Sequence, residues 1–587
     1  MAGRRAETGC ASRDRLAHPR RRVHLGVPGP RRHRGQGPPR LAGSQPDGHL
    51  GQLRPGDPRR DDLHREIRVG AGRRRGGRPR VAPAANQRHR HRAQRAGRGR
   101  RPRRHGDRDG QGEARLRPGH PRPQGDRVLT ALGPRLVVAG TRSGAGKTTV
   151  ATGLMAAFRQ RGWRVASAKV GPDFIDPGYH SVATGRPGRN LDPWMCGADL
   201  MGPLAARAAE GADVLVVEGV MGLFDGAADG TPSSTAEVAK RLGAPVVLVV
   251  DAASTSQSVA AVVHGFRTWD PEVRVAGVVL NLVGSDNHEA MLRSALADAP
   301  VYGVLRRDDA MRWRSRHLGL QPVAEDPAGV RQALDRLAVS ISECCDLDEL
   351  MRLARSAPSL PTASLAGPRR VVGDRARPLV AVASGPAFSF SYPDNLEALG
   401  AAGAEVVTFD PCVDEGLPAQ TSAVLAGGGF PEVYADALAA NEPMLRSVAD
   451  HHRRGGVIWA ECGGLLWLTR SLDGSAMAGV VDADATMGGG RVLGYRSAAT
   501  TGPSPLGPAG TEVRGHEFHY SATDPGGDAL VLAGRHGTTT GGFAAPHLLA
   551  SYLHIHLASY PTLAETFVSA AAQSALPTSG TAGHGTR

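Results

Sequence analysis

The sequence predicts an α/β protein with two consecutive domains, each built on a sheet of mostly parallel strands. Three observations carry this prediction. Residues 130–350 alternate valine-rich segments with segments rich in alanine, leucine and arginine, the pattern of strand–helix–strand units. A glycine-rich loop follows the first long apolar strand, at residues 140–149. A second α/β series begins near Pro378, after a stretch at 356–377 that starts with many proline, serine and alanine residues.

The N-terminal residues 1–127 differ in composition from the rest. They hold 35 arginines, 11 acidic residues and no lysine, and they show no hydrophobic periodicity. Such a segment cannot bury enough apolar surface to fold alone, so we expect it to be disordered. Its arginines could neutralise nucleic-acid phosphates. We favour another explanation, because translation of GC-rich DNA in an unintended frame produces the same composition; we expect a native start near Val128 and no nucleic-acid partner.

The remainder of the chain is mildly acidic. Residues 128–587 hold 37 basic and 45 acidic residues, although the net charge of the whole chain is +16. The cysteines, at 10, 196, 344, 345, 412 and 462, form no Cys-x-x-Cys pair, which argues against a zinc ribbon or a disulfide framework. Apolar runs are shorter than the ~18 residues of a membrane span, and no signal sequence is evident. We expect a cytoplasmic protein without a membrane partner.

The glycine-rich loop has the features of a phosphate-binding loop. Its glycines let backbone amides approach phosphate oxygens, while Lys147 can reach the outer phosphates and Thr148 can coordinate Mg²⁺. In the G-x-x-x-x-G-K-[ST] pattern the first place is taken by Thr141, with glycine one residue earlier. A glycine turn without nucleotide is the alternative. The predicted nucleotide-binding residues are Gly140, Thr141, Gly144, Gly146, Lys147, Thr148 and Thr149.

Further candidates lie where later strands end. Five acidic residues gather there: Asp173, Asp176, Asp192, Glu218 and Asp225. The carboxyl ends of parallel strands meet at one edge of a sheet, where carboxylates can hold Mg²⁺ or act on a substrate. Each acid alone could be an ordinary loop cap, but together they indicate a site. Asn281, at the end of an apolar strand, could contact an adenine base or cap that strand.

A second reactive centre is predicted at Cys462. The cysteine follows an apolar strand at 456–460 and precedes Gly463 and a helical segment. This is the place of a nucleophile at a strand-to-helix turn, where the helix dipole favours a thiolate. A buried structural thiol is the alternative. Upstream, another strand runs into glycines at 427–429, whose amides could hold an oxyanion.

A base for this thiol is expected downstream. Residues 551–557 are predicted to form a strand, which sends His554 and His556 to the same face. A cysteine–histidine arrangement is then available for nucleophilic catalysis. The sequence His-Glu-Phe-His at 516–519 lacks the His-Glu-x-x-His spacing that places two zinc ligands on one helical face, so we expect no metal there.

These motifs resemble those of the cobyrinic/hydrogenobyrinic acid a,c-diamide synthases over residues 130–565. The matching strings include Lys-x-Gly-Pro-Asp-Phe-Ile-Asp-Pro at 169–177 and Glu-Gly-Val-Met-Gly-Leu-Phe-Asp-Gly at 218–226. The phosphate-binding loop resembles that of dethiobiotin-synthetase-like ATPases. Ala-Glu-Cys-Gly-Gly at 460–464 and Tyr-x-His-x-His at 552–556 resemble a triad-type class I glutamine amidotransferase domain.

The resemblance implies a domain organisation that we adopt as a prediction. The expected parts are a disordered leader (1–127), a P-loop ATP-binding amidoligase domain (128–355), a linker (356–377), a glutamine amidotransferase domain (378–575) and a disordered tail (576–587).

The resemblance also implies a reaction: ATP- and glutamine-dependent amidation of the a and c carboxylates of hydrogenobyrinic or cobyrinic acid, in cobalamin biosynthesis. The GC-rich character of the sequence favours the metal-free hydrogenobyrinic acid. A cobyric acid synthase, a nickel-sirohydrochlorin amidase and a non-amidating P-loop scaffold ATPase are the alternatives. Ammonia must then pass between two centres, and whether one chain or a homodimer closes its route stays open.

Residue roles follow from the same resemblance. Cys462 would attack glutamine with His554 as its base, and amides near Gly428 and Gly463 would hold the oxyanion. His556 stands where many triad amidotransferases carry glutamate, so the third triad member is open. The implied Mg²⁺ ligands are Thr148, Asp173 and Glu218. The residues implied to position substrate or to protonate leaving groups are Asp176, Asp192 and Asp225.

Overall fold

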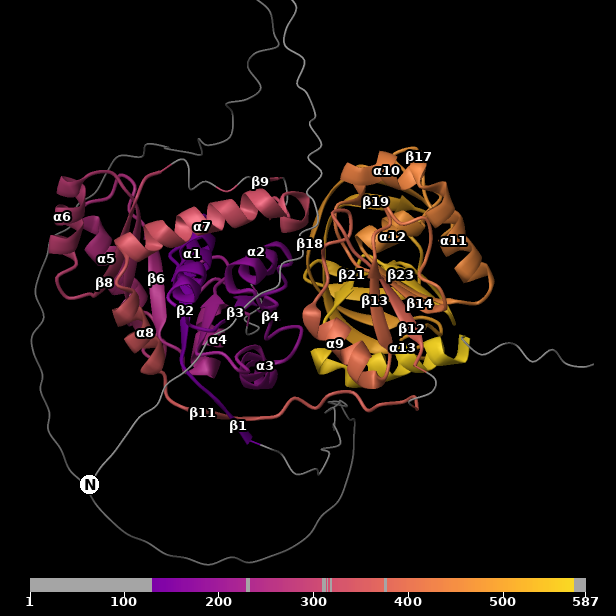
Figure 1. Ribbon diagram of the computed structural model, residues 1–587, viewed down its shortest axis with the longest axis horizontal. Coiled ribbons are helices and arrows are strands. Elements are labelled where there is room, and N and C mark those ends of the chain that lie inside the picture. The colour runs from indigo at the N-terminus through magenta and orange to yellow at the C-terminus, as the bar shows by residue number, and fades with distance from the viewer. Residues whose placement is uncertain are drawn as a thin grey trace, which may run out of the picture. The chain divides into compact units, whose positions relative to one another are not determined.

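The computed structural model describes residues 129–227, 233–308, 313, 315–316, 319–373 and 377–574 (Figure 1). The predicted leader and tail lie outside these residues. One compact unit, Pro118–Arg587, includes both predicted α/β domains. Across the described ranges, no helix combines the length and the apolar character that crossing a membrane would require.

The first domain is built on a parallel sheet. In the described part of the chain its seven strands are ordered β4 (Arg189–Leu191), β3 (Val165–Val170), β5 (Val214–Glu218), β2 (Arg135–Gly140), β6 (Val246–Asp251), β7 (Val275–Val283) and β8 (Val301–Arg306). The strands are valine-rich and almost fully buried because helices cover both faces. The predicted parallel α/β sheet is confirmed.

Two groups of helices cover this sheet (Figure 1). One face carries α1 (Lys147–Gln160), α2 (Ile175–Thr184), α7 (Pro327–Cys344) and α8 (Leu347–Arg355). The other carries α3 (Met201–Ala208), α4 (Thr235–Leu242), α5 (Ser258–Thr268) and α6 (Asp286–Ala295). Because β2, β3 and β5 are neighbours, the loops that follow them come together at one edge of the sheet.

The second domain has a mixed sheet of its own. Its order, among described residues, is β13 (Glu405–Phe409), β12 (Leu379–Ala383), β14 (Thr421–Ala426), β15 (Val457–Glu461), β23 (Leu548–Ser551) and β22 (Phe543–Ala545), and only β22 is antiparallel to its neighbour. On one face pack α9 (Pro393–Ala402) and α13 (Pro561–Ser574). The other face carries α10 (Ala435–Ala440), α11 (Glu442–Arg453) and α12 (Gly463–Leu468).

A second, mostly antiparallel sheet, which the sequence patterns did not predict, belongs to this domain. Its long strands are β18 (Asp484–Thr500) and β19 (Glu512–Asp524). The other strands are β16 (Ser471–Leu472), β17 (Ser475–Ala476), β20 (Leu530–Gly534), β21 (Gly537–Gly541) and β24 (His554–Ile555).

The prediction of one strand over 551–557 is wrong. The chain leaves the mixed sheet at Ser551, bends, and joins β19 through β24, where His516 pairs with His554. Ile555 donates its amide to the side chain of Glu461 at 3.1 Å, a bond that holds the short second piece against the mixed sheet. The histidine segment therefore connects two sheets.

The predicted linker contains regular structure. Residues of β11 (Leu360–Ala363) pair antiparallel with β1 (Leu129–Leu132). Next to this ribbon the buried guanidinium of Arg135 donates to the carbonyls of Leu242 at 2.6 Å, Gly133 at 2.7 Å and Pro358 at 2.7 Å. Arg135 thus ties the start of the linker to the first sheet.

We expect Arg135→Met to destabilise the first domain, because buried carbonyls that lose their donor cost ~1–3 kcal/mol each. The predicted loss is roughly 3 kcal/mol or more in the free energy of unfolding, measured by urea titration with circular dichroism. Arg446→Met is the matched control, since Arg446 is 65% exposed and pairs with Glu442 on the surface. Equal losses in the two variants would contradict this account of Arg135.

Candidate active sites

The phosphate-binding loop connects β2 to α1, and Gly146 shapes it. This glycine has φ 98°, and a Cβ at this position would lie 2.1 Å from Nδ2 of Asn281. Only glycine tolerates both conditions. Asn281 donates to the carbonyl of Ala145 at 3.0 Å and accepts the amide of Leu282 at 3.0 Å. Asn281 therefore braces the loop against β7, and its predicted contact with an adenine base stays a prediction.

The other predicted loop residues lie in the same turn. Lys147 is buried, and its Nζ donates to the carbonyl of Arg142 at 3.2 Å. Burial and the nearby charge of Lys169 lower the pKa of Lys147 to about 8. The Thr149 hydroxyl accepts Nε1 of Trp313 at 3.2 Å. The predicted glycines Gly140 and Gly144 and the backbone of Thr141 complete the turn.

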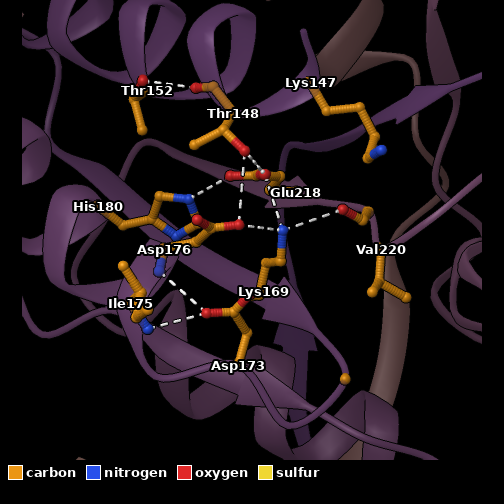
Figure 2. Close-up of polar contacts among 12 residues, drawn as sticks. Lys147, Thr148, Thr152, Lys169, Asp173, Ile175, Asp176, His180, Glu218 and Val220 are labelled. Atoms are coloured by element: carbon orange, nitrogen blue, oxygen red, sulfur yellow. Dashed lines mark hydrogen bonds and ion pairs between the residues drawn. The ribbon is translucent and has the colours of Figure 1, made fainter. Parts of the chain in front are cut away.

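Figure 2 shows a buried polar cluster at the carboxyl ends of β3 and β5. Nζ of Lys169 lies 2.5 Å from Oδ2 of Asp176 and 2.8 Å from Oε1 of Glu218. The Thr148 hydroxyl, at the start of α1, donates to Glu218 Oε1 at 2.6 Å and lies 3.4 Å from Asp176 Oδ2. Nε2 of His180 lies 2.6 Å from the second oxygen of Glu218. We call these five residues the carboxylate cluster.

Electrostatic interactions keep two members of this cluster, Lys169 and Glu218, charged. Burial opposes ionisation of Glu218, but Lys169 and His180 hold its pKa below the ordinary value. Burial likewise opposes the charge of Lys169, yet Asp176 and Glu218 raise its pKa. Burial and the neighbouring Asp173 raise the pKa of Asp176 well above its usual range. The Lys169–Glu218 ion pair is therefore the charged centre, beside a carboxyl group that protonates more readily.

The remaining predicted acids take other places. Asp173 caps α2, because its Oδ1 accepts the amides of Ile175 at 2.8 Å and Asp176 at 3.0 Å. The carboxylate of Asp225 accepts the amide of Gly222 at 2.9 Å, and its charge raises the pKa of Lys147 against the larger effect of burial. Asp225 therefore lies beside the phosphate-binding loop.

Asp192 belongs to a contact between the two domains. One carboxylate oxygen accepts the amides of Trp194 and Met195, each at 2.9 Å, and the other accepts the hydroxyl of Tyr495 on β18 at 2.9 Å. Burial raises the pKa of Asp192 to about 6. Its carboxylate is thus occupied by these three donors rather than by the carboxylate cluster.

Cys462 stands at a strained turn between β15 and α12. Its φ of 49° is unusual for a residue with a side chain, and such strain is typical of functional turns. The amide of Gly464 donates to Gly427 at 2.9 Å, and a Cβ on Gly463 would lie 3.0 Å from the amide nitrogen of Gly429. The predicted glycine loop at 427–429 therefore packs against the turn that carries the thiol.

The structure places His554 beside this turn. A Cβ on Gly428 would lie 2.5 Å from Cε1 of His554, and Nδ1 of the ring lies 3.4 Å from Oε2 of Glu461. Burial disfavours the charged ring, but the neighbouring Cys462 and Glu461 raise the pKa of His554 to about 10. The imidazolium form is therefore held between a thiol and a carboxylate.

Sequence reasoning missed Glu461 as the partner of His554. Its only signal was a carboxylate at the end of an otherwise apolar, fully buried strand. His556, the residue at the sequence position of the third triad member, has different neighbours. Its ring lies 4.7 Å from that of Tyr392, and Nε2 lies 3.9 Å from Asp394. Burial lowers the pKa of His556.

The raised pKa of His554 predicts a pH dependence of stability. The imidazolium contributes stability that is fully present below about pH 6.5, its unfolded pKa, and is lost as the pH rises through about 10. Glu461→Gln removes a charge that favours the imidazolium. We therefore expect the stability difference between wild type and Glu461→Gln to shrink by at least ~1 kcal/mol from pH 6.5 to pH 10.

Urea titrations at several pH values measure this difference. Glu405→Gln, at an exposed position of the same domain, is the matched control and should show no such trend. Parallel curves for wild type and Glu461→Gln would show that the carboxylate does not support the charged ring.

Comparison with known proteins identifies both domains. Residues 136–320 match the model of the CobQ/CobB/MinD/ParA nucleotide binding domain. Residues 379–562 match that of the CobB/CobQ-like glutamine amidotransferase domain. The two centres described above fall within these matches.

Whole-length relatives cover the same region. The chain is 51% identical over 470 residues to a hydrogenobyrinate a,c-diamide synthase of Streptomyces coelicolor, covering 74% of this chain and 97% of the relative. It is 46% identical over 464 residues to one of Thermobifida fusca, covering 76% and 98%. It is 42% identical over 454 residues to a cobyrinate a,c-diamide synthase of Syntrophotalea carbinolica, covering 74% and 98%. The chain therefore belongs to the hydrogenobyrinate/cobyrinate a,c-diamide synthase family.

Proposed function

We propose that this protein uses ATP and glutamine to amidate the a and c carboxylates of hydrogenobyrinic acid, a step of cobalamin biosynthesis in the cytoplasm. The observation that carries the proposal is the pairing, in one compact unit, of a phosphate-binding loop with a Cys462–His554–Glu461 group. The metal-free ring is favoured because the relatives at 51% and 46% identity bear the hydrogenobyrinate name and that at 42% the cobyrinate name.

The first half-reaction activates the carboxylate. A carboxylate oxygen of the corrin attacks the γ-phosphorus of ATP, the bond to the β-phosphate oxygen breaks, and acyl phosphate and ADP result. Loop amides and the ammonium of Lys147 would stabilise the negative charge on the transferred phosphoryl group. Asp225, which acts on the charge of Lys147, would help to orient that ammonium.

The second half-reaction releases ammonia. The sulfur of Cys462 attacks the side-chain carbonyl of glutamine while amides near Gly428 and Gly463 bind the oxyanion. The imidazolium of His554 gives its proton to the leaving nitrogen, and ammonia departs. Water then hydrolyses the thioester to glutamate, with His554 taking a proton. Glu461 keeps the ring oriented and charged before the attack.

The last step joins the products of the two half-reactions. Ammonia attacks the acyl carbon, a C–N bond forms, the C–O bond to phosphate breaks, and inorganic phosphate and a proton leave. Each amide therefore consumes one ATP, one glutamine and one water, and yields one ADP, one phosphate and one glutamate.

Mg²⁺ fits the oxygen donors of the carboxylate cluster. Magnesium is usually held by one or two carboxylates together with substrate phosphates and water. Thr148, Glu218 and Asp176 supply a hydroxyl and two carboxylates, and the hydroxyl lies within hydrogen-bonding distance of both carboxylates. In the described ranges no three histidine, cysteine or acidic side chains gather as a metal site, so substrate oxygens would complete the shell. Asp173, the cap of α2, is replaced by Asp176 in this proposal.

A coupled assay tests the function. Purified protein with ATP, Mg²⁺ and glutamine should convert hydrogenobyrinic acid to a mono- and then a diamide, followed by mass spectrometry. Cys462→Ala should abolish amidation with glutamine and retain it with ammonium chloride, because only the nitrogen source is lost. Parallel reactions with cobyrinic acid identify the preferred ring. No amidation of either ring, from either nitrogen source, would refute the proposal.

Glu218→Gln should separate the two centres. Loss of its charge removes the partner of Lys169 and Thr148, so we expect ammonium-dependent amidation to fall by about 100-fold or more. Glutamine hydrolysis should change less than twofold, because Glu218 lies in the other domain. The control Glu210→Gln, at an exposed position, should leave both rates unchanged. Full amidation by Glu218→Gln would remove this carboxylate from the ATP-dependent step.

A further inference from the structure

One cavity borders both reactive centres. It has a volume of about 210 Å³, and its wall includes His554 of the second domain together with Asp173 and Asp176 of the first. The thiol of Cys462 lies 4.0 Å from the carbonyl oxygen of Phe518, another wall residue. A water molecule occupies ~30 Å³ in the liquid, and ammonia is of similar size, so the cavity has room for it.

Phe174 is a side chain of the first domain whose ring packs against the ring of His554. It immediately precedes α2, between Asp173 in the preceding loop and Asp176 in the first turn of the helix. Its ring centroid is 5.0 Å from that of His554, and the ring also stacks on Phe390 at 5.3 Å and on His516 at 5.7 Å. All three partners belong to the second domain. The ring of Phe174 therefore connects the site of glutamine hydrolysis to the start of α2, where Asp176 of the carboxylate cluster lies.

The wall of the cavity favours neutral ammonia. Beside His554 the wall is aromatic: Phe174, Phe390 and Phe518 surround it with apolar surface, against which burying a cation is costly. The acidic wall residues, Asp173 and Asp176, come from the first domain and not from the segment that carries the thiol. His516 stacks on His554 at 4.9 Å, and burial lowers its pKa well below the usual value, so its ring is neutral. A neutral imidazole gives no proton to ammonia, which must stay unprotonated to act as a nucleophile.

We propose that Phe174 couples glutamine hydrolysis to amide formation in this enzyme. Its ring closes the cavity around the ammonia released at Cys462, so that the ammonia reaches the acyl phosphate without escaping to water. The inference rests on the proposed function and deepens it. Ammonia moves through the cavity unchanged, so no further reactant is needed. Phe174→Ala removes the aromatic contact between His554 and the start of α2. Ammonia can then escape to water.

Isotope dilution measures this escape. The enzyme receives hydrogenobyrinic acid, ATP, Mg²⁺ and glutamine labelled with nitrogen-15 in its amide, in a buffer that contains unlabelled ammonium. Wild type should form one glutamate per amide and place nearly all of the label in the product. Phe174→Ala should form at least threefold more glutamate per amide and lose label in proportion. Its rate with saturating ammonium chloride should stay within twofold of wild type.

Two further variants sharpen the comparison. Phe174→Leu keeps apolar bulk and should be less uncoupled than Phe174→Ala; it also serves as the test if the alanine variant does not fold. Phe266→Ala is the matched control, because Phe266 is a half-buried phenylalanine of the first domain that stacks on Phe224 at 5.7 Å. It should remain fully coupled.

Some results would overturn the inference. One glutamate per amide in both Phe174 variants would show that the ring does not retain ammonia. An equal loss of glutamine-dependent and ammonium-dependent amidation would assign Phe174 to substrate binding or phosphoryl transfer instead. If wild type amidates with neither nitrogen source, the proposed function fails, and this inference falls with it.

Discussion

The ion pair between Lys169 and Glu218 is the constraint on which the first domain's site depends. Both groups are almost fully buried, and a buried charge is tolerated only when it is paired and hydrogen-bonded. Glu218 meets this condition through three partners: Lys169 from β3, Thr148 from α1 and His180 from α2. Loss of any one would leave an uncompensated buried group. The cluster therefore holds the start of α1, the end of β3 and α2 in a single arrangement.

This arrangement explains which polar side chains meet at the carboxyl edge of the first sheet, next to the phosphate-binding loop. Neighbouring parallel strands bring their carboxyl ends together, but they do not decide which side chains face one another. The buried ammonium of Lys169 does, because Asp176 and Glu218 turn toward it. Asp173, only three residues before Asp176, does not join the cluster. Its carboxylate accepts the amides at the start of α2, which have no acceptor within the helix. Two acids three residues apart thus take different roles: Asp176, in the first turn of α2, belongs to the cluster, and Asp173, in the preceding loop, caps the helix.

The same contrast shows what could be predicted from the sequence. Features set by local chain geometry were found: the phosphate-binding loop, the acids at strand ends, and the turn at Cys462 with its glycines. Features set by contacts between distant segments were not. Glu461 becomes the partner of His554 only because the chain bends after β23 and enters another sheet. The β18–β19 sheet has half-exposed strands with several glycines, so its pattern is weak. The pairing of β11 with β1 joins residues more than 220 positions apart.

Contacts between the domains converge on the segment that carries His554. Arg189, at β4 of the first domain, lies 2.8 Å from Asp394 on α9. The next residue, Asn395, donates to the carbonyl of Ile555 at 2.7 Å and accepts the amide of Leu557 at 2.7 Å, so it holds the backbone on the C-terminal side of His554. Phe174 touches the ring of His554 itself. Two segments of the first domain thus reach His554: β4 acts on its backbone through α9, and Phe174 acts on its ring. If either segment shifted on ligand binding, the position of that ring relative to Cys462 would change, because the connecting side chains are buried and have little freedom to absorb the movement. In the proposed mechanism, the packing around His554 would therefore match glutamine hydrolysis to acyl phosphate formation.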